Sequence, residues 1–246
     1  MSILALKSIS KNFGAIEALK NVNLNLDKGQ VVGLMGDNGA GKSTLIKIIA
    51  GVFQANTGEI LYNDQQVNFS KPIDARNSGI EVVYQDLALC DNLTAAANIF
   101  LSRELFKKFF YIPFLNYKKM YDVSQGLFDE LKSETRPRDE VKLMSGGQRQ
   151  AVAIARTKLT EAKIVLMDEP TAAISVRQVA EVLDYIRQLR DQGISIILIS
   201  HRMPDVFEVS DRIVVLRRGS KVADKKISNS SPEEVTALIT GALQSA

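Results

Sequence analysis

The sequence predicts an α/β fold built on a parallel sheet, and three observations lead to this prediction. The runs 31–35, 163–168 and 194–200 are short and rich in apolar residues, which is typical of strands buried on both faces. Segments with helical spacing lie between such runs, at 44–50 and 176–192. Because strands separated by helices are joined by right-handed crossovers, we expect the strands to lie parallel in one sheet.

Length and composition limit the class of protein. The 246 residues fit one large α/β domain or a core with a subdomain, and a net charge of +3 is too small to suggest a nucleic-acid partner. The single cysteine, Cys90, excludes an internal disulfide framework and suits a reducing cytoplasm. No apolar run approaches the roughly 18–20 residues of a membrane helix, and the N-terminus lacks a secretory signal. We therefore expect a soluble protein that reaches a membrane only through a partner.

Further strands and one more helix are expected around this sheet. Val22, Leu24 and Leu26 alternate with asparagines, which is the pattern of a half-buried strand. Ser231 followed by Pro232 predicts a helix start, with a serine cap and proline in the first turn. The remaining predictions are strands within 3–33, at 58–62 and at 79–84, and a hairpin at 212–225.

From about residue 90 to residue 159 the chain becomes mostly helical in character. We predict that residues 90–159 form a helical subdomain inserted into a core domain of residues 1–89 and 160–246. The aromatic residues of this segment are interpreted as its core rather than as a ligand site: Phe100, Phe106, Phe109, Phe110, Tyr111 and Phe114.

The octapeptide 36–43, Gly-Asp-Asn-Gly-Ala-Gly-Lys-Ser, reads G-x-x-x-x-G-K-S between an apolar strand and a helix. This is the context that a phosphate-binding loop requires. Its glycines let consecutive backbone N–H groups face an anion, and the helix adds its positive dipole end. Lys42 can reach the β- and γ-phosphates, and the Ser43 hydroxyl can ligate Mg²⁺. The motif predicts binding of a nucleoside triphosphate.

Two adjacent carboxylates, Asp168 and Glu169, follow the predicted strand 163–168. They lie at its carboxyl end, where ligands of open α/β sheets collect. One carboxylate there can bind Mg²⁺, and its neighbour can orient or deprotonate the attacking water.

A third motif, Ser145-Gly146-Gly147-Gln148, leads directly into a helical run. A serine at a helix start followed by two glycines is a second exposed anion-binding helix N-terminus. Together with the other motifs it resembles the signature of ATP-binding cassette (ABC) ATPases.

Four other positions match this family in chain order. Gln85 follows an apolar strand like the family's glutamine loop, and Pro170 follows Glu169 as after the family's Walker B aspartate. His201, the only histidine, follows a buried strand as the switch histidine does. Phe13 stands where the family carries an aromatic residue that stacks on adenine.

The resemblance implies a P-loop NTPase core with a parallel sheet, an antiparallel β subdomain and an inserted helical subdomain. It implies ATP and Mg²⁺ as cofactors, with Glu169 as general base and His201, Gln85 and Lys42 as further catalytic residues. Mg²⁺ would be held by Ser43, Gln85 and Asp168. The implied nucleotide-binding residues are Phe13, Gly36, Asp37, Asn38, Gly39, Ala40, Gly41, Lys42, Ser43, Thr44, Ser145, Gly146, Gly147 and Gln148.

The resemblance also implies partners. In the family the signature motif of one subunit completes the site of another, so we expect a second copy of the chain in an ATP-bound dimer. Most cassettes carry aspartate where this chain has Ser175, and this departure, the run 171–173 and the ending at 232–241 are similar to bacterial importers of the ribose, xylose and fructose type.

The function expected from the resemblance is an ATPase that powers a membrane importer, most simply one for a monosaccharide. Its partners would be transmembrane permease subunits and, indirectly, a secreted sugar-binding protein, with no nucleic acid. The subunit would lie peripherally at the cytoplasmic face of the membrane. The alternatives are the ATPase of another transporter class and a soluble ABC ATPase without a permease.

Overall fold

The computed structural model describes residues 2–84, 86–109, 111–160, 162–172 and 174–243. The chain divides into two compact units. We call them the sheet unit, which comprises Met1–Val82, Ala162–Pro170 and Leu183–Ala246, and the helical unit, which comprises Val83–Glu161 and Thr171–Val182.

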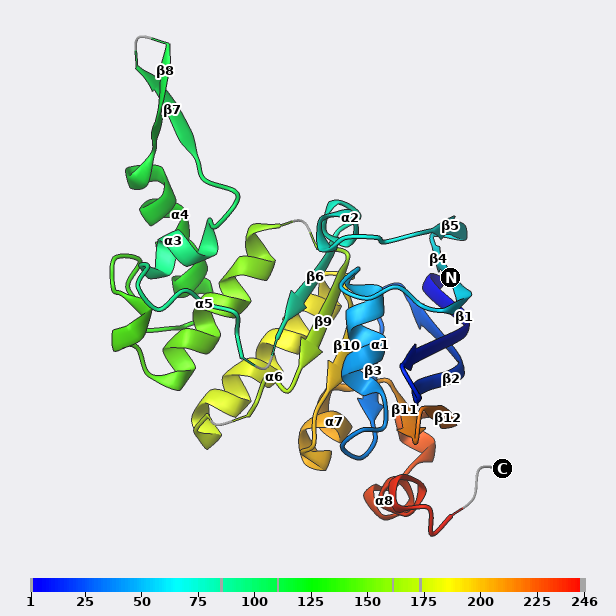
Figure 1. Cartoon of the computed structure of the whole chain (residues 1–246). Helices are drawn as coiled ribbons and strands as arrows, with labels where there is room; N and C mark the ends of the chain where they lie inside the picture. The colour runs from blue at the N-terminus through cyan, green and yellow to red at the C-terminus, as the bar shows by residue number, and fades with distance from the viewer. Residues whose placement is uncertain (1, 85, 110, 161, 173, 244–246) are drawn as a thin grey trace. The chain divides into compact units, whose positions relative to one another are not determined.

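A six-stranded sheet in the order β12-β11-β3-β10-β9-β6 carries the parallel arrangement that the sequence predicts (Figure 1). The neighbours β11–β3, β3–β10 and β10–β9 pair in parallel, and β12 adds an antiparallel edge. Every residue of β3 and β10 is buried, as expected for strands covered on both faces. The strands are β3 (Val31–Met35), β6 (Ile80–Val83), β9 (Ile164–Asp168), β10 (Ser195–Ile199), β11 (Arg212–Arg217) and β12 (Ser220–Lys226).

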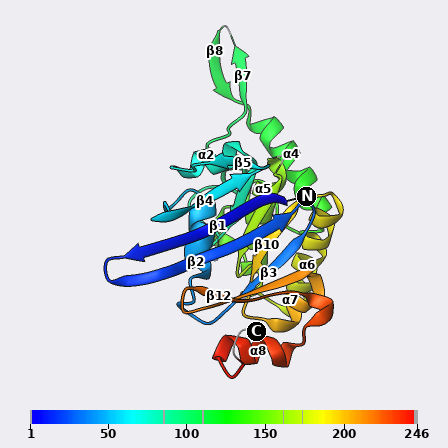
Figure 2. The ribbon, with the colours of Figure 1, turned by 90° about the vertical axis from the view of Figure 1, so that its right-hand side faces the viewer.

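A second sheet is antiparallel, with the strand order β2-β1-β4-β5. The alternation predicted for its second strand is confirmed, because Val22, Leu24 and Leu26 are all buried. Figure 2 shows β1 and β2 as a long pair crossing the view. The strands are β1 (Ser2–Phe13), β2 (Ile16–Asp27), β4 (Thr57–Tyr62) and β5 (Gln65–Val67).

The helices of the sheet unit are α1 (Lys42–Ile49), α2 (Pro72–Asn77), α7 (Met203–Val209) and α8 (Pro232–Thr240), with a 3₁₀ turn at Ile227–Asn229. The helix start predicted at Ser231 is confirmed, because its side chain accepts a hydrogen bond from the backbone N–H of Glu234 at 3.2 Å. Helix α6 (Val176–Asp191) contributes residues to both units. In the described part of the chain no helix combines the length and the apolar character needed to cross a bilayer.

One apolar core joins both sheets to α1 in the sheet unit. Leu34 from β3, Leu45 from α1 and Ile199 from β10 are each 0–1% exposed within it. Full burial of such a side chain contributes about 1.5–3 kcal/mol. This packing holds the ends of β3 and β10 in place, and the loops that carry polar residues of the site begin at these ends.

The helical unit contains α3 (Ala95–Ile99), β7 (Phe106–Phe109), β8 (Ile112–Leu115), α4 (Tyr117–Glu130), a 3₁₀ turn at Val141–Leu143 and α5 (Gly146–Leu159). Its core includes Phe100, Met120, Phe128 and Val152, each at most 2% exposed. The interpretation of Phe100 as core is therefore confirmed.

The same interpretation is wrong for the aromatic residues that follow. Phe106, Tyr111 and Phe114 are 60%, 97% and 48% exposed. They lie on a two-stranded hairpin of β7 and β8 rather than on helices, so they have no helical face to bury. Phe110 lies outside the described residues.

The segment before α3 is held by one buried amide, Asn98, which is 0% exposed. Its side-chain oxygen accepts from the backbone N–H of Cys90 at 2.7 Å. Its side-chain nitrogen donates to the carbonyls of Cys90 at 3.0 Å and Thr94 at 3.1 Å. A single side chain thereby satisfies the backbone of a loop that has no regular structure of its own.

We expect Asn98→Ala to lower the free energy of unfolding by about 2–3 kcal/mol, because it leaves buried backbone groups without partners. The measurement is urea denaturation of the variant and its parent. Asn92→Ala is the matched control in the same loop, since Asn92 is exposed, and it should change the stability by less than about 0.5 kcal/mol. Equal losses in the two variants would contradict the role given to Asn98.

Candidate functional site

The phosphate loop runs from the end of β3 to the start of α1, as the motif predicts. Gly36 and Gly41 have φ values of +151° and +104°, which favour glycine. A Cβ at Gly36 would lie 2.3 Å from the carbonyl oxygen of Leu216, and one at Gly41 would lie 2.6 Å from that of Ala18. Only glycine fits where the loop passes this close to neighbouring backbone.

Gly41 caps α1 without a side-chain hydrogen bond to the first turn. Such a helix start leaves backbone N–H groups and the positive dipole end free for an anion. Asp37, Asn38 and Gly39 are exposed at the rim of the loop. The loop therefore has the shape of a phosphate cradle, with the N-terminus of α1 directed at the anion.

Lys42 lies inside this cradle and is 7% exposed. Its Nζ donates to the carbonyl oxygens of Gly36 at 2.7 Å and Asp37 at 3.1 Å. Burial lowers the pKa of Lys42 below its usual value, while the nearby carboxylates of Glu169, Asp168 and Asp37 act in the opposite direction. Phosphate oxygens in the cradle would likewise favour the charged ammonium.

The register of the parallel sheet brings three predicted site segments together. Ile199 of β10 pairs with Leu34 of β3 on one side and with Asp168 of β9 on the other. The carboxyl ends of β3, β10 and β9 therefore meet at one edge of the sheet. The phosphate loop, His201 and the pair Asp168-Glu169 follow directly from these three ends.

Glu169 is held in one conformation by β10 and the residues after it. Its φ of +54° is uncommon for a residue other than glycine, and its N–H donates to the carbonyl of Ile199 at 2.9 Å. Its Oε2 accepts from the backbone N–H of His201 at 3.1 Å, and Nε2 of His201 lies 3.1 Å from Oε1. The carboxylate is 8% exposed and the imidazole 55%. The buried carboxylate of Glu169 is thus oriented by the backbone of His201, whose imidazole is more accessible.

Gly219 supports the phosphate loop, although the sequence showed it only as a turn residue. Its N–H donates to the carbonyl of Ala40 at 3.1 Å, and its own carbonyl accepts from the N–H of Lys20 at 2.8 Å. The contact joins residues 179 positions apart in the chain, and periodicity and local motifs carry no signal for such a contact.

Phe13 lies at the end of β1 and is 41% exposed. Its ring packs edge-on against Phe53, with centroids 5.2 Å apart, and Nζ of Lys11 lies 5.3 Å from its centroid. The ring is therefore held in place and keeps an accessible surface of the kind that can stack on a base.

Ser145 caps α5, which confirms the helix start expected at the third motif. Its side chain accepts from the N–H of Gln148, and its own N–H donates to Oε1 of Gln148 at 3.0 Å. Ser145 and Gly146 are exposed, so the helix start is open to a ligand. Gly147 and Gln148 are half-buried. All four belong to the helical unit, and Gln85 lies outside the described residues.

Ser175 makes the same type of cap at the start of α6. Its N–H and Oγ both lie 3.0 Å from Oε1 of Gln178, and Oγ accepts from the N–H of Gln178. The amide end of Gln178 also lies against Gly147, where an added Cβ would approach Nε2 to 1.6 Å. Gln178 thus links the starts of α5 and α6, a contact that the sequence did not predict.

We expect Ser175→Asp to preserve the stability of the protein within about 0.5 kcal/mol, because aspartate caps a helix as well as serine does. Ser175→Ala, the matched control, should lose about 1 kcal/mol. Urea unfolding of the three proteins measures the difference. If Ser175→Asp lowered the free energy of unfolding more than Ser175→Ala does, helix capping would not explain the serine at this position.

The residues predicted to hold Mg²⁺ fit that ion in their chemistry. The Ser43 hydroxyl and the Asp168 carboxylate are the hard oxygen donors that Mg²⁺ prefers, and both side chains are at least partly accessible. Among the described residues no group of three or more histidine, cysteine, aspartate or glutamate residues forms a ready metal cluster. Such a set suits an ion that is bound together with the phosphates of a nucleotide.

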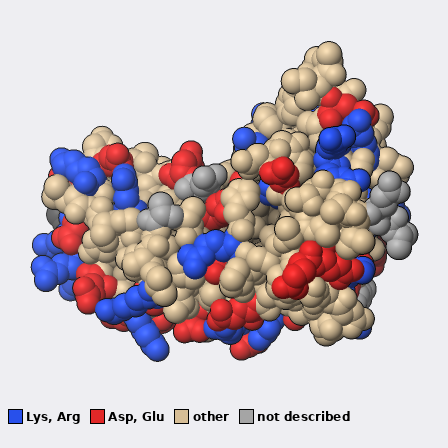
Figure 3. All heavy atoms as spheres, turned by 90° about the horizontal axis from the view of Figure 1, so that it is seen from below, with Lys and Arg blue, Asp and Glu red and all other residues tan. Residues whose placement is uncertain are grey.

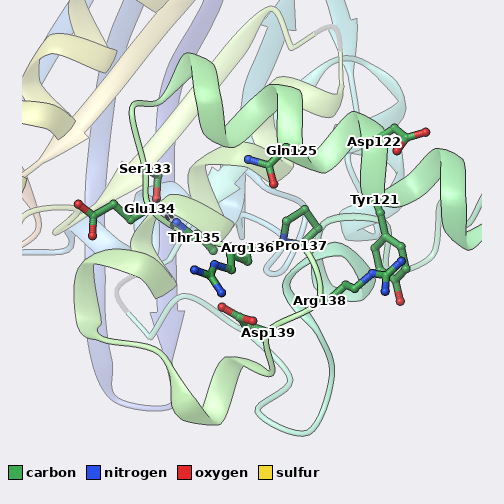
Figure 4. Close-up of a pocket in the computed structure, with 10 residues that line it drawn as sticks. All are labelled: Tyr121, Asp122, Gln125, Ser133, Glu134, Thr135, Arg136, Pro137, Arg138 and Asp139. Atoms are coloured by element: carbon green, nitrogen blue, oxygen red, sulfur yellow. Dashed lines mark hydrogen bonds between the residues drawn. The ribbon is translucent and has the colours of Figure 1, made fainter.

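Other surface features lie apart from these residues. On the face seen in Figure 3, basic and acidic side chains are interspersed, without one continuous basic region. The helical unit has a pocket of about 710 Å³ beside α4, in which the Arg138 guanidinium lies 4.9 Å from the ring centroid of Tyr121 (Figure 4). None of the predicted site residues lines this pocket.

Comparison with known proteins gives consistent matches. The model of the ABC transporter family matches residues 19–172, which is more than half of the chain. The xylose/arabinose import ATP-binding protein XylG of Sulfolobus acidocaldarius is 45% identical over 97% of this chain and 94% of its own length. The ribose import ATP-binding protein RbsA of Yersinia pestis is 40% identical, and the galactose/methyl galactoside import ATP-binding protein MglA of Clostridium perfringens is 38% identical. The chain spans about half the length of these two relatives, 46% of each.

Solved structures agree on the fold. A nucleotide-free ATP-binding cassette matches 98% of the chain with a TM-score of 0.80 at 24% identity. A dimeric cassette in a post-hydrolysis state with ADP and Pi matches 91% of the chain with a TM-score of 0.78 at 26% identity. The predicted fold class is confirmed by these matches.

Proposed function

The chain belongs to the ABC transporter family, and on that premise we propose that it hydrolyses ATP to power the import of a monosaccharide. The observation that carries the proposal is the meeting of the phosphate loop, Glu169 and His201 at one edge of the parallel sheet. The sugar class is supported by the relatives, which are named for the import of xylose and arabinose, ribose, and galactose.

We propose that the cradle of residues 36–44 holds the triphosphate. Lys42 exchanges its two loop carbonyls for β- and γ-phosphate oxygens, which makes the same buried ammonium available to the nucleotide. The accessible face of Phe13 stacks on adenine. Ser43, Asp168 and Gln85 would hold Mg²⁺, which would supply positive charge to offset that of the phosphates.

In the hydrolysis step, water attacks the γ-phosphorus and Glu169 accepts the proton that the water loses, so that ATP and water give ADP and inorganic phosphate. The backbone N–H of His201 orients the carboxylate through a hydrogen bond to Oε2, and Nε2 lies beside Oε1 without forming a hydrogen bond. We propose that Nε2 leaves Glu169 for the γ-phosphate when ATP binds. The histidine would then act both as a support of the base and as a sensor of the nucleotide.

Two copies of the chain would form the working unit. The exposed helix start at Ser145 is supplied by a different unit of the chain from the phosphate loop, and the dimeric cassettes among the structural matches support pairing. We propose that the signature of one copy closes on the ATP of the other. The pair would bind permease subunits at the cytoplasmic face of the membrane and, through them, respond to a secreted sugar-binding protein.

The proposal is tested by measuring phosphate release from MgATP by the chain assembled with its permease in liposomes. Binding proteins loaded with xylose, ribose or galactose are added in turn, and an amino-acid-binding protein is the matched control. We expect one of the sugars to stimulate turnover and the control to have no effect. Stimulation by the amino-acid-binding protein alone would assign the ATPase to another transporter class.

A further inference from the structure

The β7–β8 hairpin has an unusual composition for an exposed element. The segment 105–120 contains six aromatic residues and four lysines, and it has no aspartate or glutamate. The rest of the chain holds 27 basic and 28 acidic side chains, so the net positive charge of the protein comes from this segment. Figures 1 and 2 both show the hairpin extending away from the helices of its own unit.

Both faces of the hairpin combine apolar and basic side chains. Phe106 lies opposite Leu115, and Lys107 lies opposite Phe114. Because side chains alternate between the faces of a strand, neither face is wholly polar or wholly apolar. An open groove is lined by these four residues together with Lys108, Pro113 and Tyr117. In the part of the chain that the structure describes, no third strand pairs with them, because β7 and β8 form a two-stranded sheet.

At the tip of the hairpin, Tyr111 adopts a left-handed backbone conformation that is unfavourable for a bulky residue. Tyr111 has a φ of +68°, a conformation that two-residue hairpin turns normally assign to asparagine or glycine. A bulky residue with this φ is a backbone outlier, and such outliers mark sites where something other than stability selects the residue. The tyrosine is 97% exposed and the neighbouring Ile112 57%.

The four lysines of the segment are free to contact an anionic partner. Lys107, Lys108, Lys118 and Lys119 are all exposed, and within the described residues none has an ion-pair partner. Exposed lysines beside exposed aromatic and aliphatic side chains match the boundary of an anionic lipid bilayer, where rings sit at headgroup level and basic residues contact lipid phosphates.

We propose that the β7–β8 hairpin and its flanks, the described residues 105–109 and 111–120, form a membrane-surface anchor that binds anionic phospholipid. It places Tyr111 and Ile112 at the headgroup boundary, with the four lysines on lipid phosphates. The inference rests on the proposed function in one respect, because a subunit that serves a permease works beside a bilayer. The anchor would limit the rotation of the helical unit at the membrane independently of the permease contact.

The first test uses flotation of the purified full chain, without permease or nucleotide, with vesicles of phosphatidylglycerol or phosphatidylcholine. We expect binding to phosphatidylglycerol vesicles that weakens with added salt. The double variant Lys107→Glu/Lys108→Glu should weaken it at least about 25-fold, or about fivefold for each lysine. Lys7→Glu/Lys28→Glu makes the same change in net charge at exposed positions outside the hairpin and should leave binding within about twofold of the parent.

The second test reports on the tip. Because the chain has no tryptophan, Tyr111→Trp introduces a single tryptophan, whose emission is followed by selective excitation. Its emission should shift to shorter wavelength with phosphatidylglycerol vesicles, whereas that of Ile16→Trp, an exposed position on β2, should not. Circular dichroism of each variant checks folding.

Two results would overturn the anchor. One is that the parent binds neither vesicle, or binds as well with both hairpin lysines reversed. The other is that reversal leaves vesicle binding unchanged but prevents association with the permease, which would make the hairpin a protein contact. Neither assay involves ATP turnover or sugar, so failure of the anchor is distinguishable from failure of the proposed function.

Discussion

Glu169→Gln should bind MgATP as the parent does and hydrolyse it about 10²–10⁴-fold more slowly, because the amide cannot accept the proton of the attacking water. The hydrogen bond from the His201 N–H is retained by the amide oxygen, so the local structure is preserved. Phosphate release at saturating MgATP measures the rate, and calorimetry measures the affinity. We also expect ATP to accumulate the variant as a dimer, since the step that reopens the pair is blocked.

Glu59→Gln is the matched control for this experiment. Glu59 is an exposed residue of β4, and neutralising it removes the same charge without touching the site. Its turnover should stay within about twofold of the parent, because surface substitutions have small effects. A rate for Glu169→Gln close to that of Glu59→Gln would remove Glu169 as the base.

Lys42→Ala should weaken MgATP binding by about 10- to 100-fold. The ammonium is the buried cation of the cradle, and hydrogen bonds to charged groups contribute about 1.5–3 kcal/mol each. Lys47→Ala removes a lysine from the same helix, but Nζ of Lys47 lies over the Phe53 ring, 5.6 Å from its centroid. The control should bind MgATP normally. Equal affinities for Lys42→Ala and Lys47→Ala by calorimetry would contradict the assignment of the cradle.

The elements that were predictable from the sequence have local causes. The parallel strands were predictable because their apolar runs are too continuous for strands that are exposed on one face. The helix starts at Ser145 and Ser231 were predictable because these side chains cap the helix backbone. The family was recognisable because its motifs are short, ordered and attached to these elements, and the family match confirms it.

The features that were missed depend on long-range contacts or on exceptions to local rules. Gly219 donates to Ala40 from the turn after the neighbouring strand β11, and Gln178 lies against Gly147 from another helix, so no local pattern contains either contact. The hairpin at 106–115 has Tyr111 in its turn, where glycine or asparagine is usual. Because the sequence lacks this turn signal, the aromatic residues were interpreted as the core of a helical segment. The place of Gln85 remains a prediction, since that residue lies outside the described part of the chain.

The central claim is that ATP hydrolysis at Glu169 drives sugar import, and one measurement tests it directly. Labelled sugar uptake is followed in liposomes that contain the chain and its permease, with ATP on the side of the chain and loaded binding protein on the other. The account predicts uptake by the parent only when ATP is present, and uptake at background level for Glu169→Gln although ATP is bound. Uptake by Glu169→Gln at the parent's rate, or uptake by the parent without ATP, would contradict it.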